Sequence, residues 1–129
     1  MYRLALAFGI FCIPVAVLAE DCGDLQTQYE MNVCARDDHA KVDAQMNRDY
    51  NAYRARLSAE QARQFRDAQR AWIRFRDLSC AYESSGVKGG SVYPLILSSC
   101  LAGMTRERIR QIGELATCKE GNLSCPAWQ

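Results

Sequence analysis

The side chains in this chain that could do chemistry are one histidine, seven cysteines and many carboxylates. His39 falls on the apolar side of a helical pattern, which indicates a partly buried, satisfied side chain rather than a catalytic base. The sequence contains no Gly-x-Ser-x-Gly elbow and no glycine-rich phosphate loop before a helix. It also lacks a Cys-x-x-Cys pair, which disfavours a zinc site. The sequence therefore predicts no catalytic residue, no metal and no cofactor.

Charged side chains are the better candidates for a binding site. Arg70 and Arg74 lie one helical turn apart and could donate forked hydrogen bonds to carboxylates or phosphates. Lys88 lies in a glycine-rich loop that could enter a partner's cleft. Asp38 and Asp43, in the acidic N-terminal half, could attract a basic partner locally. The alternative is that the arginines pair with acids of the preceding helix, such as Asp38, Asp43 and Asp49.

The N-terminus has the pattern of an export signal. Arg3 precedes an apolar run from Leu4 to Leu18, and small residues lead to a cut after Ala19. The run is too short for a comfortable membrane span. We therefore expect a signal peptide over 1–19 and a domain over 20–129, located in the periplasm or secreted, with no stable membrane insertion.

The charge balance argues against nucleic acid as a partner. The whole chain has 16 basic and 15 acidic residues, and loss of Arg3 with the signal leaves 15 of each. A nucleic-acid-binding protein is expected to have a net basic footprint.

Cysteines are expected to form three disulfides. Six remain after signal removal, and an even count in a small exported chain is typical of a disulfide framework. An antiparallel hairpin places Cys34 level with Cys80, which predicts Cys34–Cys80. Cys118–Cys125 would close a local turn, and Cys22–Cys100 remains by elimination. The competing set Cys22–Cys80 with Cys34–Cys100 stays open.

Helical periodicity dominates the sequence after the signal. The first helical region runs over 27–57, with a possible separate short helix at 27–34, and the second runs from Ser58 to about Tyr82. Thr27 and Ser58 each precede a capping-box partner by three residues. The apolar stripe of the first region comprises Ala35, His39, Val42, Met46, Tyr50, Tyr53 and Leu57.

The remaining elements complete an all-α prediction. We expect a third helical region capped by Ser91, a break or bend at Gly103, a continuation capped by Thr105, and an irregular tail from Cys118. In the second region Ala68, Trp72, Phe75 and Ser79 share one face, which predicts a central, inward-facing helix. The fold expected is a small disulfide-stabilised helical bundle built on an antiparallel helix hairpin.

Several motifs together carry a family resemblance. They are Thr27-Gln28-x-Glu30-Met31-Asn32-x-Cys34-Ala35, Asp43-x-x-Met46-Asn47-x-x-Tyr50, Ala68-Gln69-Arg70-Ala71-Trp72-Ile73-x-Phe75-Arg76-Asp77-x-x-Cys80, Gly89-Gly90-Ser91, Cys100 and Thr105-x-x-Arg108. From about Cys22 to Leu115 the chain resembles the lysozyme inhibitor LprI family. The resemblance implies a small, exported, helical, disulfide-bonded domain, and it supplies no catalytic residue.

The function expected from these observations is binding. The leading hypothesis is inhibition of lysozyme or a related peptidoglycan-cleaving enzyme by occlusion. The alternative is a structural or stress-related envelope protein that binds cell-wall material or another protein without inhibiting an enzyme. Recovery of a peptidoglycan hydrolase from envelope extract would favour the first.

Overall fold

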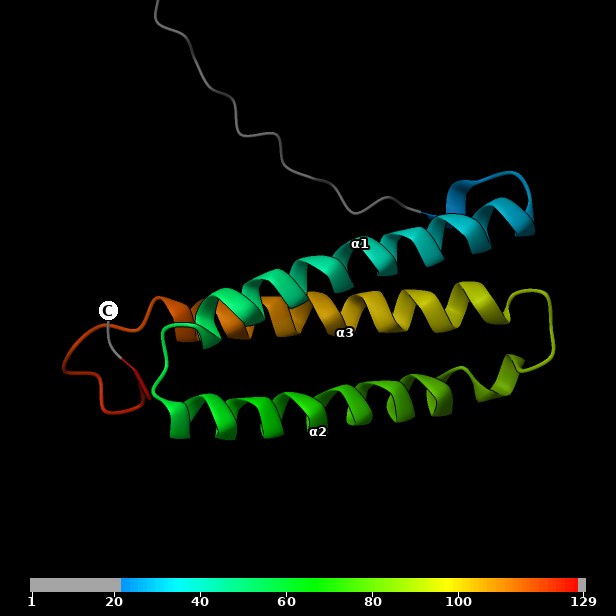
Figure 1. Ribbon diagram of the computed structural model, residues 1–129. Coiled ribbons are helices and arrows are strands. Elements are labelled where there is room, and N and C mark those ends of the chain that lie inside the picture. Colours follow the sequence, from blue (N-terminus) through cyan, green and yellow to red (C-terminus); the bar gives the residue numbers. More distant parts are fainter. Residues whose placement is uncertain (1–21, 128–129) are drawn as a thin grey trace, which may run out of the picture.

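The computed structural model describes residues 22–127, and within that range it contains helices and no strand (Figure 1). In chain order the elements are η1 (Cys22–Asp24), α1 (Gln28–Arg54), α2 (Ala59–Glu83), η2 (Ser85–Val87) and α3 (Tyr93–Ala116). The predicted all-α bundle is therefore confirmed. The predicted signal peptide, 1–19, lies outside the described residues.

The first helix, α1, begins at the predicted cap. The Thr27 hydroxyl accepts a hydrogen bond from the Glu30 backbone N–H, and the Glu30 carboxylate accepts one from the Thr27 N–H. This reciprocal pair satisfies two backbone donors that the first turn leaves free. The helix then continues without a break to Arg54, so the possible separate short helix is absent. Ala35, Met46 and Tyr53 are buried, which confirms the predicted apolar stripe.

The second helix, α2, also begins at its predicted cap, but it turns a different face inward. Ser58 and Gln61 form the expected capping box. The fully buried positions are Gln69, Arg76 and Cys80, whereas Phe75 keeps 61% of its surface exposed. The predicted inward face of Ala68, Trp72, Phe75 and Ser79 is therefore wrong at the exposed residues Ala68 and Phe75, whereas Trp72 packs against the core. Polar Gln69 and Arg76 occupy the inward positions because other helices provide their hydrogen-bond partners.

The third helix, α3, is longer and more regular than expected. Val92 is its N-cap residue, without a side-chain bond, and a proline occupies the first turn, where no N–H partner is needed. Ser91 therefore does not act as the predicted cap. Gly103 does not interrupt the helix, and Thr105 is buried mid-helix rather than capping a second segment. The Thr105 hydroxyl donates to the Leu101 carbonyl oxygen at 2.7 Å.

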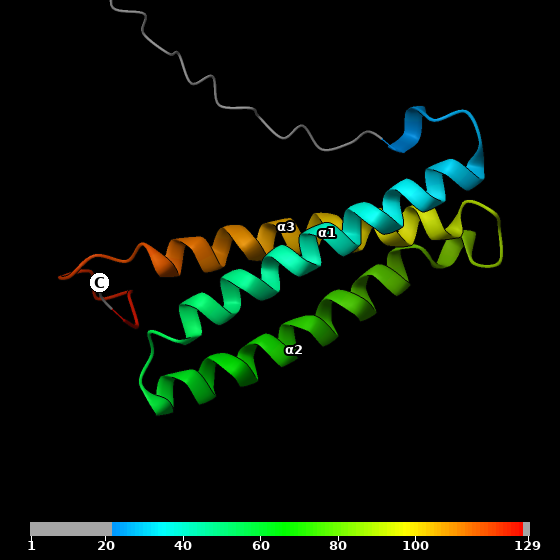
Figure 2. The ribbon, with the colours of Figure 1, turned by 45° about the horizontal axis from the view of Figure 1, so that its top comes forward.

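The core lies where α1 packs along α3, which are the two most closely packed helices (Figures 1 and 2). Met46, Tyr53 and Ile112 form its buried centre. The α2 helix stands further from this pair, and large side chains such as Phe65 and Trp72 fill the space between. The expectation of a central second helix is therefore wrong, because bulky and charged side chains hold α2 at a distance from its neighbours.

Three disulfides are present, and two of them differ from the expected pairs. The bonds are Cys22–Cys34, Cys80–Cys100 and Cys118–Cys125, each with Cα atoms 5.6 Å apart. Cys34–Cys80 and Cys22–Cys100 were expected and are wrong, as is the competing set. Two cysteines at the same level of neighbouring helices do not necessarily form a disulfide, because the bond requires Cα atoms within about 7 Å of each other. Instead, η1 packs beside α1, and the short η2 connection returns α3 to Cys80.

Candidate binding surface

Both predicted acidic residues take part in ion pairs between helices. The Arg106 Nη2 on α3 lies 2.5 Å from the Asp38 Oδ1, and the Arg76 Nη1 on α2 lies 2.8 Å from the Asp43 Oδ1. Each acid therefore links α1 to another helix. Their role in binding a partner stays a prediction, whereas their contribution to holding the helices together is visible in these contacts.

Arg76 is the centre of a buried charged network that the sequence patterns did not reveal. Its side chain is 8% exposed, and besides Asp43 it contacts the Asp77 carboxylate at 2.9 Å and donates to the Thr105 hydroxyl at 3.1 Å. The guanidinium also lies 5.4 Å from the centroid of the Trp72 ring. A buried guanidinium needs such partners, because desolvation is costly without them. The spacing of seven between Gln69 and Arg76 is the sequence signal for one inward face.

Arg70 and Arg74, in contrast, remain available to a partner. Both are exposed on α2, and neither pairs with a carboxylate in the part of the chain that the structure describes. The alternative that they pair with acids of the first helix is therefore wrong. Asp43 pairs with Arg76, Asp38 pairs with Arg106, and Asp49 accepts a hydrogen bond from Gln45. Unpaired, exposed guanidinium groups can form forked bonds to carboxylates without first breaking internal ion pairs.

Lys88 is exposed but lies away from these two arginines. It follows η2, beyond the end of α2 at Glu83. The nine residues from Arg74 to Glu83 span about 13 Å of helix. The structure therefore brings Arg70 and Arg74 together and leaves Lys88 outside that pair.

Apolar side chains lie beside the two arginines on the outside of α2. Phe75, Leu78 and Tyr82 keep 61%, 61% and 81% of their surfaces exposed, and Ala71 is exposed as well. Their positions step by four, three and four, so they form one stripe along the helix. We call the surface made by Arg70, Ala71, Arg74, Phe75, Leu78 and Tyr82 the α2 outer face.

The composition of the α2 outer face is that of a protein-binding surface. Exposed apolar groups that lie together, rather than singly, mark interaction sites. Aromatic residues and arginine are enriched at interface positions that contribute most to affinity. Sequence reasoning identified the arginines but assigned Phe75 to the core. The regular spacing of Ala71, Phe75, Leu78 and Tyr82 was the signal that could have revealed the outer stripe.

His39 lies next to the Arg76 network rather than in a catalytic arrangement. Burial lowers the pKa of His39, the Arg76 charge lowers it further, and Asp43, Asp77 and Asp38 partly oppose this shift. The Nε2 atom is buried and has no hydrogen-bond partner among the described residues. The predicted partial burial of His39 is therefore confirmed, whereas the prediction of a satisfied side chain is wrong at Nε2.

No group of three or more histidine, cysteine or acidic side chains within residues 22–127 could hold a metal ion. No helix among the described residues is both long and apolar enough to cross a membrane.

Comparisons with known proteins agree with the sequence motifs. The family model described as "Lysozyme inhibitor LprI" matches residues 19–112. An uncharacterized protein of Rhizobium meliloti (strain 1021) is 32% identical over 113 residues, which cover 78% of this chain and 81% of that protein. No solved structure matches the chain. The extent of the family match, which includes all of α1 and α2, shows that the chain belongs to the lysozyme inhibitor LprI family.

Proposed function

We propose that this protein is exported and inhibits lysozyme or a related peptidoglycan-cleaving enzyme by covering its substrate cleft. Family membership supports the inhibitor role. The apolar run after Arg3, the small residues before Glu20 and the three disulfides support export to an oxidising compartment. The protein acts by binding, without chemistry of its own.

The observation that carries the proposal is the α2 outer face. Most glycoside hydrolases use two carboxylates on either side of the scissile bond, roughly 5–9.5 Å apart. Arg70 and Arg74 are one turn apart on α2, or about 6 Å along the axis. Because they have no internal carboxylate partner in the described chain, both guanidinium groups can approach a pair of acids in a partner's cleft.

The apolar stripe would supply the remaining affinity. Phe75, Leu78 and Tyr82 lie beside the arginines and can displace water from around the charged contacts. The chain as a whole is close to neutral, so long-range steering contributes little. Affinity therefore depends on this one face, and changes confined to it should abolish inhibition.

A turbidity assay with the purified, oxidised protein tests the proposal against chicken-type, goose-type and bacterial lysozymes. We expect saturable inhibition of at least one type. The double variant Arg70→Glu/Arg74→Glu should weaken that inhibition at least tenfold, because each lost contact costs about 1–2 kcal/mol or more. Lys119→Glu, in the tail, reverses one charge away from this face and should inhibit normally. Equal inhibition by all three proteins would exclude the α2 outer face, and no inhibition of any enzyme would exclude the function.

A further inference from the structure

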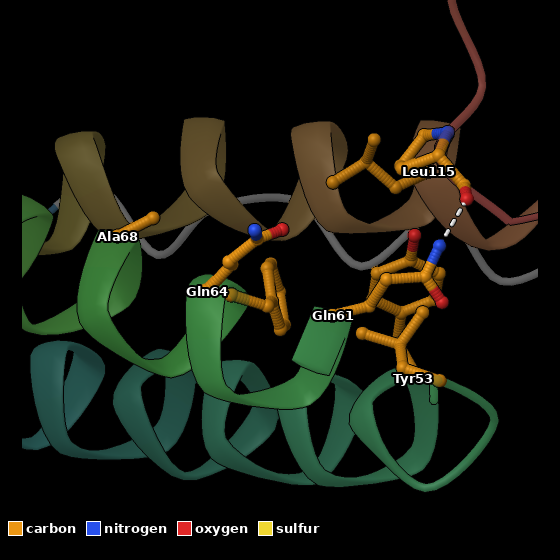
Figure 3. A pocket seen from close by; sticks show the side chains of 8 residues that line it. Tyr53, Gln61, Gln64, Ala68 and Leu115 are labelled. Atoms are coloured by element: carbon orange, nitrogen blue, oxygen red, sulfur yellow. Dashed lines mark hydrogen bonds between the residues drawn. The ribbon is translucent and has the colours of Figure 1, made fainter. Parts of the chain in front are cut away.

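A pocket of about 240 Å³ opens where the turn between α1 and α2 meets the end of α3 (Figure 3). Its walls include the apolar side chains of Leu57, Phe65 and Leu115. An apolar cavity of about 150 Å³ is known to accept benzene. The pocket therefore has room for one substituted aromatic ring, but it is smaller than the 300–1,000 Å³ typical of sites for drug-sized molecules.

A buried hydroxyl group lies in this pocket without a partner. Tyr53 is 2% exposed, and its side chain points from α1 toward Leu115 of α3 (Figure 3). The Tyr53 hydroxyl has no hydrogen-bond partner among residues 22–127. Phe65 packs edge-on against the Tyr53 ring, with centroids 5.1 Å apart, and so fixes its position. A buried hydroxyl normally has a hydrogen-bond partner, so this group is free to bond a ligand.

Two glutamines supply the polar edge of the pocket. Gln61 projects from the first turn of α2 beside Tyr53, and Gln64 lies further along the helix, between Gln61 and Ala68 (Figure 3). The Gln64 amide nitrogen donates to the Glu60 carboxylate at 3.0 Å, whereas its carbonyl oxygen has no donor within the described part of the chain. The pocket thus offers a hydroxyl that can donate and a carbonyl that can accept. A ligand hydroxyl complements the Tyr53 hydroxyl, because it can accept a hydrogen bond from it.

The C-terminal tail closes one side of the pocket. The Gln61 side-chain nitrogen donates to the Pro126 carbonyl oxygen at 2.5 Å, and the Cys118–Cys125 disulfide closes the tail into a loop. The Arg56 guanidinium donates to the Ala116 carbonyl oxygen at 2.8 Å, which fixes the end of α3 beside the same turn. These contacts hold the tail in place as one wall of the pocket. Pro126, which lines this wall, lies beyond the family match, which ends at residue 112.

We propose that this pocket binds a small phenol, with its ring among Leu57, Phe65 and Leu115 and its hydroxyl bonded to the Tyr53 hydroxyl. The proposal is independent of enzyme inhibition, since the α2 outer face shares no residue with the pocket. The ligand hydroxyl accepts a hydrogen bond from the Tyr53 hydroxyl. It therefore exchanges its bonds with water for bonds with the protein.

Titration with p-cresol, followed by the backbone amide signals of Leu57, Gln61, Ala68 and Leu115 in NMR spectra of the oxidised protein, tests the proposal. Toluene, which lacks the hydroxyl, is the matched ligand. We expect p-cresol to give saturable shifts confined to the pocket. Tyr53→Phe should weaken the binding of p-cresol at least threefold and leave the binding of toluene unchanged, because only the hydrogen bond is lost.

A pair of alanine variants separates the pocket from general surface binding. Ala68 lines the pocket and Ala81 is exposed on the same helix outside it. Ala68→Leu should reduce p-cresol binding at least tenfold by filling the space, while Ala81→Leu should bind normally. The proposal is overturned if p-cresol causes no saturable shifts of the pocket signals in the folded wild-type protein. It is also overturned if Tyr53→Phe leaves the affinity for both ligands unchanged, or if Ala68→Leu binds p-cresol as tightly as wild type.

Discussion

At the scale of single residues, neighbouring arginines on α2 have opposite roles. Arg76 is buried and contacts α1 and α3, whereas Arg74, two positions earlier, is exposed and unpaired within residues 22–127. Their residue type is the same, so composition alone does not distinguish them. The direction in which each points on the helix decides whether its charge stabilises the fold or is free for a partner.

Replacing Arg76 should destabilise the protein strongly. Arg76→Ala leaves Asp43 without its cation and removes the contact with Trp72. We expect a loss of about 2–4 kcal/mol in the free energy of unfolding, below the roughly 3–5 kcal/mol of a fully buried pair. The reduction reflects the 35% exposure of the Asp43 side chain. Urea unfolding measures this loss, and Arg74→Ala is the control, with a change within about 0.5 kcal/mol. Equal losses would contradict the assigned roles.

His39 should make stability depend on pH. Burial and Arg76 lower its pKa in the folded state below the usual 6.5, so the unfolded chain binds the proton more readily. Stability is therefore fully present above about pH 6.5 and decreases as the pH falls toward the lower folded pKa. Urea unfolding at pH 7.5 and 5.5 measures this decrease, and His39→Gln should reduce it. If His39→Gln lost as much stability between pH 7.5 and 5.5 as wild type, groups other than His39 would cause the pH dependence.

At the scale of elements, local signals predicted the helices better than their orientations. Both capping boxes and the α1 stripe followed from residue types at fixed spacings. The inward face of α2 did not, because its buried positions include the polar residues Gln69 and Arg76, which contribute nothing to an apolar pattern. Gln69 is buried because its carbonyl oxygen accepts from the Arg108 Nε at 2.8 Å, a partner 39 residues away. Long-range partners of this kind have no signature in the local pattern.

Truncation of large apolar residues should separate the two faces of the bundle. Phe75→Ala should change the free energy of unfolding by less than about 1 kcal/mol, because the side chain is already 61% exposed. Ile112→Ala should cost about 2–5 kcal/mol, since Ile112 is 1% exposed in the core. Thermal or urea unfolding measures both changes. A large loss from Phe75→Ala would contradict an exposed α2 outer face.

At the scale of the whole molecule, disulfides connect neighbouring elements rather than the two ends of the chain. Cys80–Cys100 joins α2 to α3 across 20 residues, and Cys118–Cys125 closes a loop of 7. The sequence predicted the number of cysteine pairs and the local tail pair. The other two pairs depend on how closely the helices approach one another, which helix lengths alone do not determine.

Loss of the Cys80–Cys100 bond should reduce stability. Cys80→Ala/Cys100→Ala should cost about 3 kcal/mol by freeing the chain in the unfolded state. Unfolding of this variant beside the oxidised wild type measures the loss. Peptide mapping without reduction should recover Cys22–Cys34 and Cys80–Cys100 as linked fragments. A Cys34–Cys80 fragment would contradict the fold.

The most direct measurement is the inhibition constant of the oxidised protein against a sensitive lysozyme, determined at several concentrations of a soluble oligosaccharide substrate. Occlusion of the cleft through the α2 outer face predicts that the apparent inhibition constant rises linearly with substrate concentration, starting from its value without substrate. It also predicts that Arg70→Glu/Arg74→Glu weakens inhibition at least tenfold. The account would be contradicted by no inhibition at micromolar excess over each enzyme type, or by inhibition that substrate does not relieve.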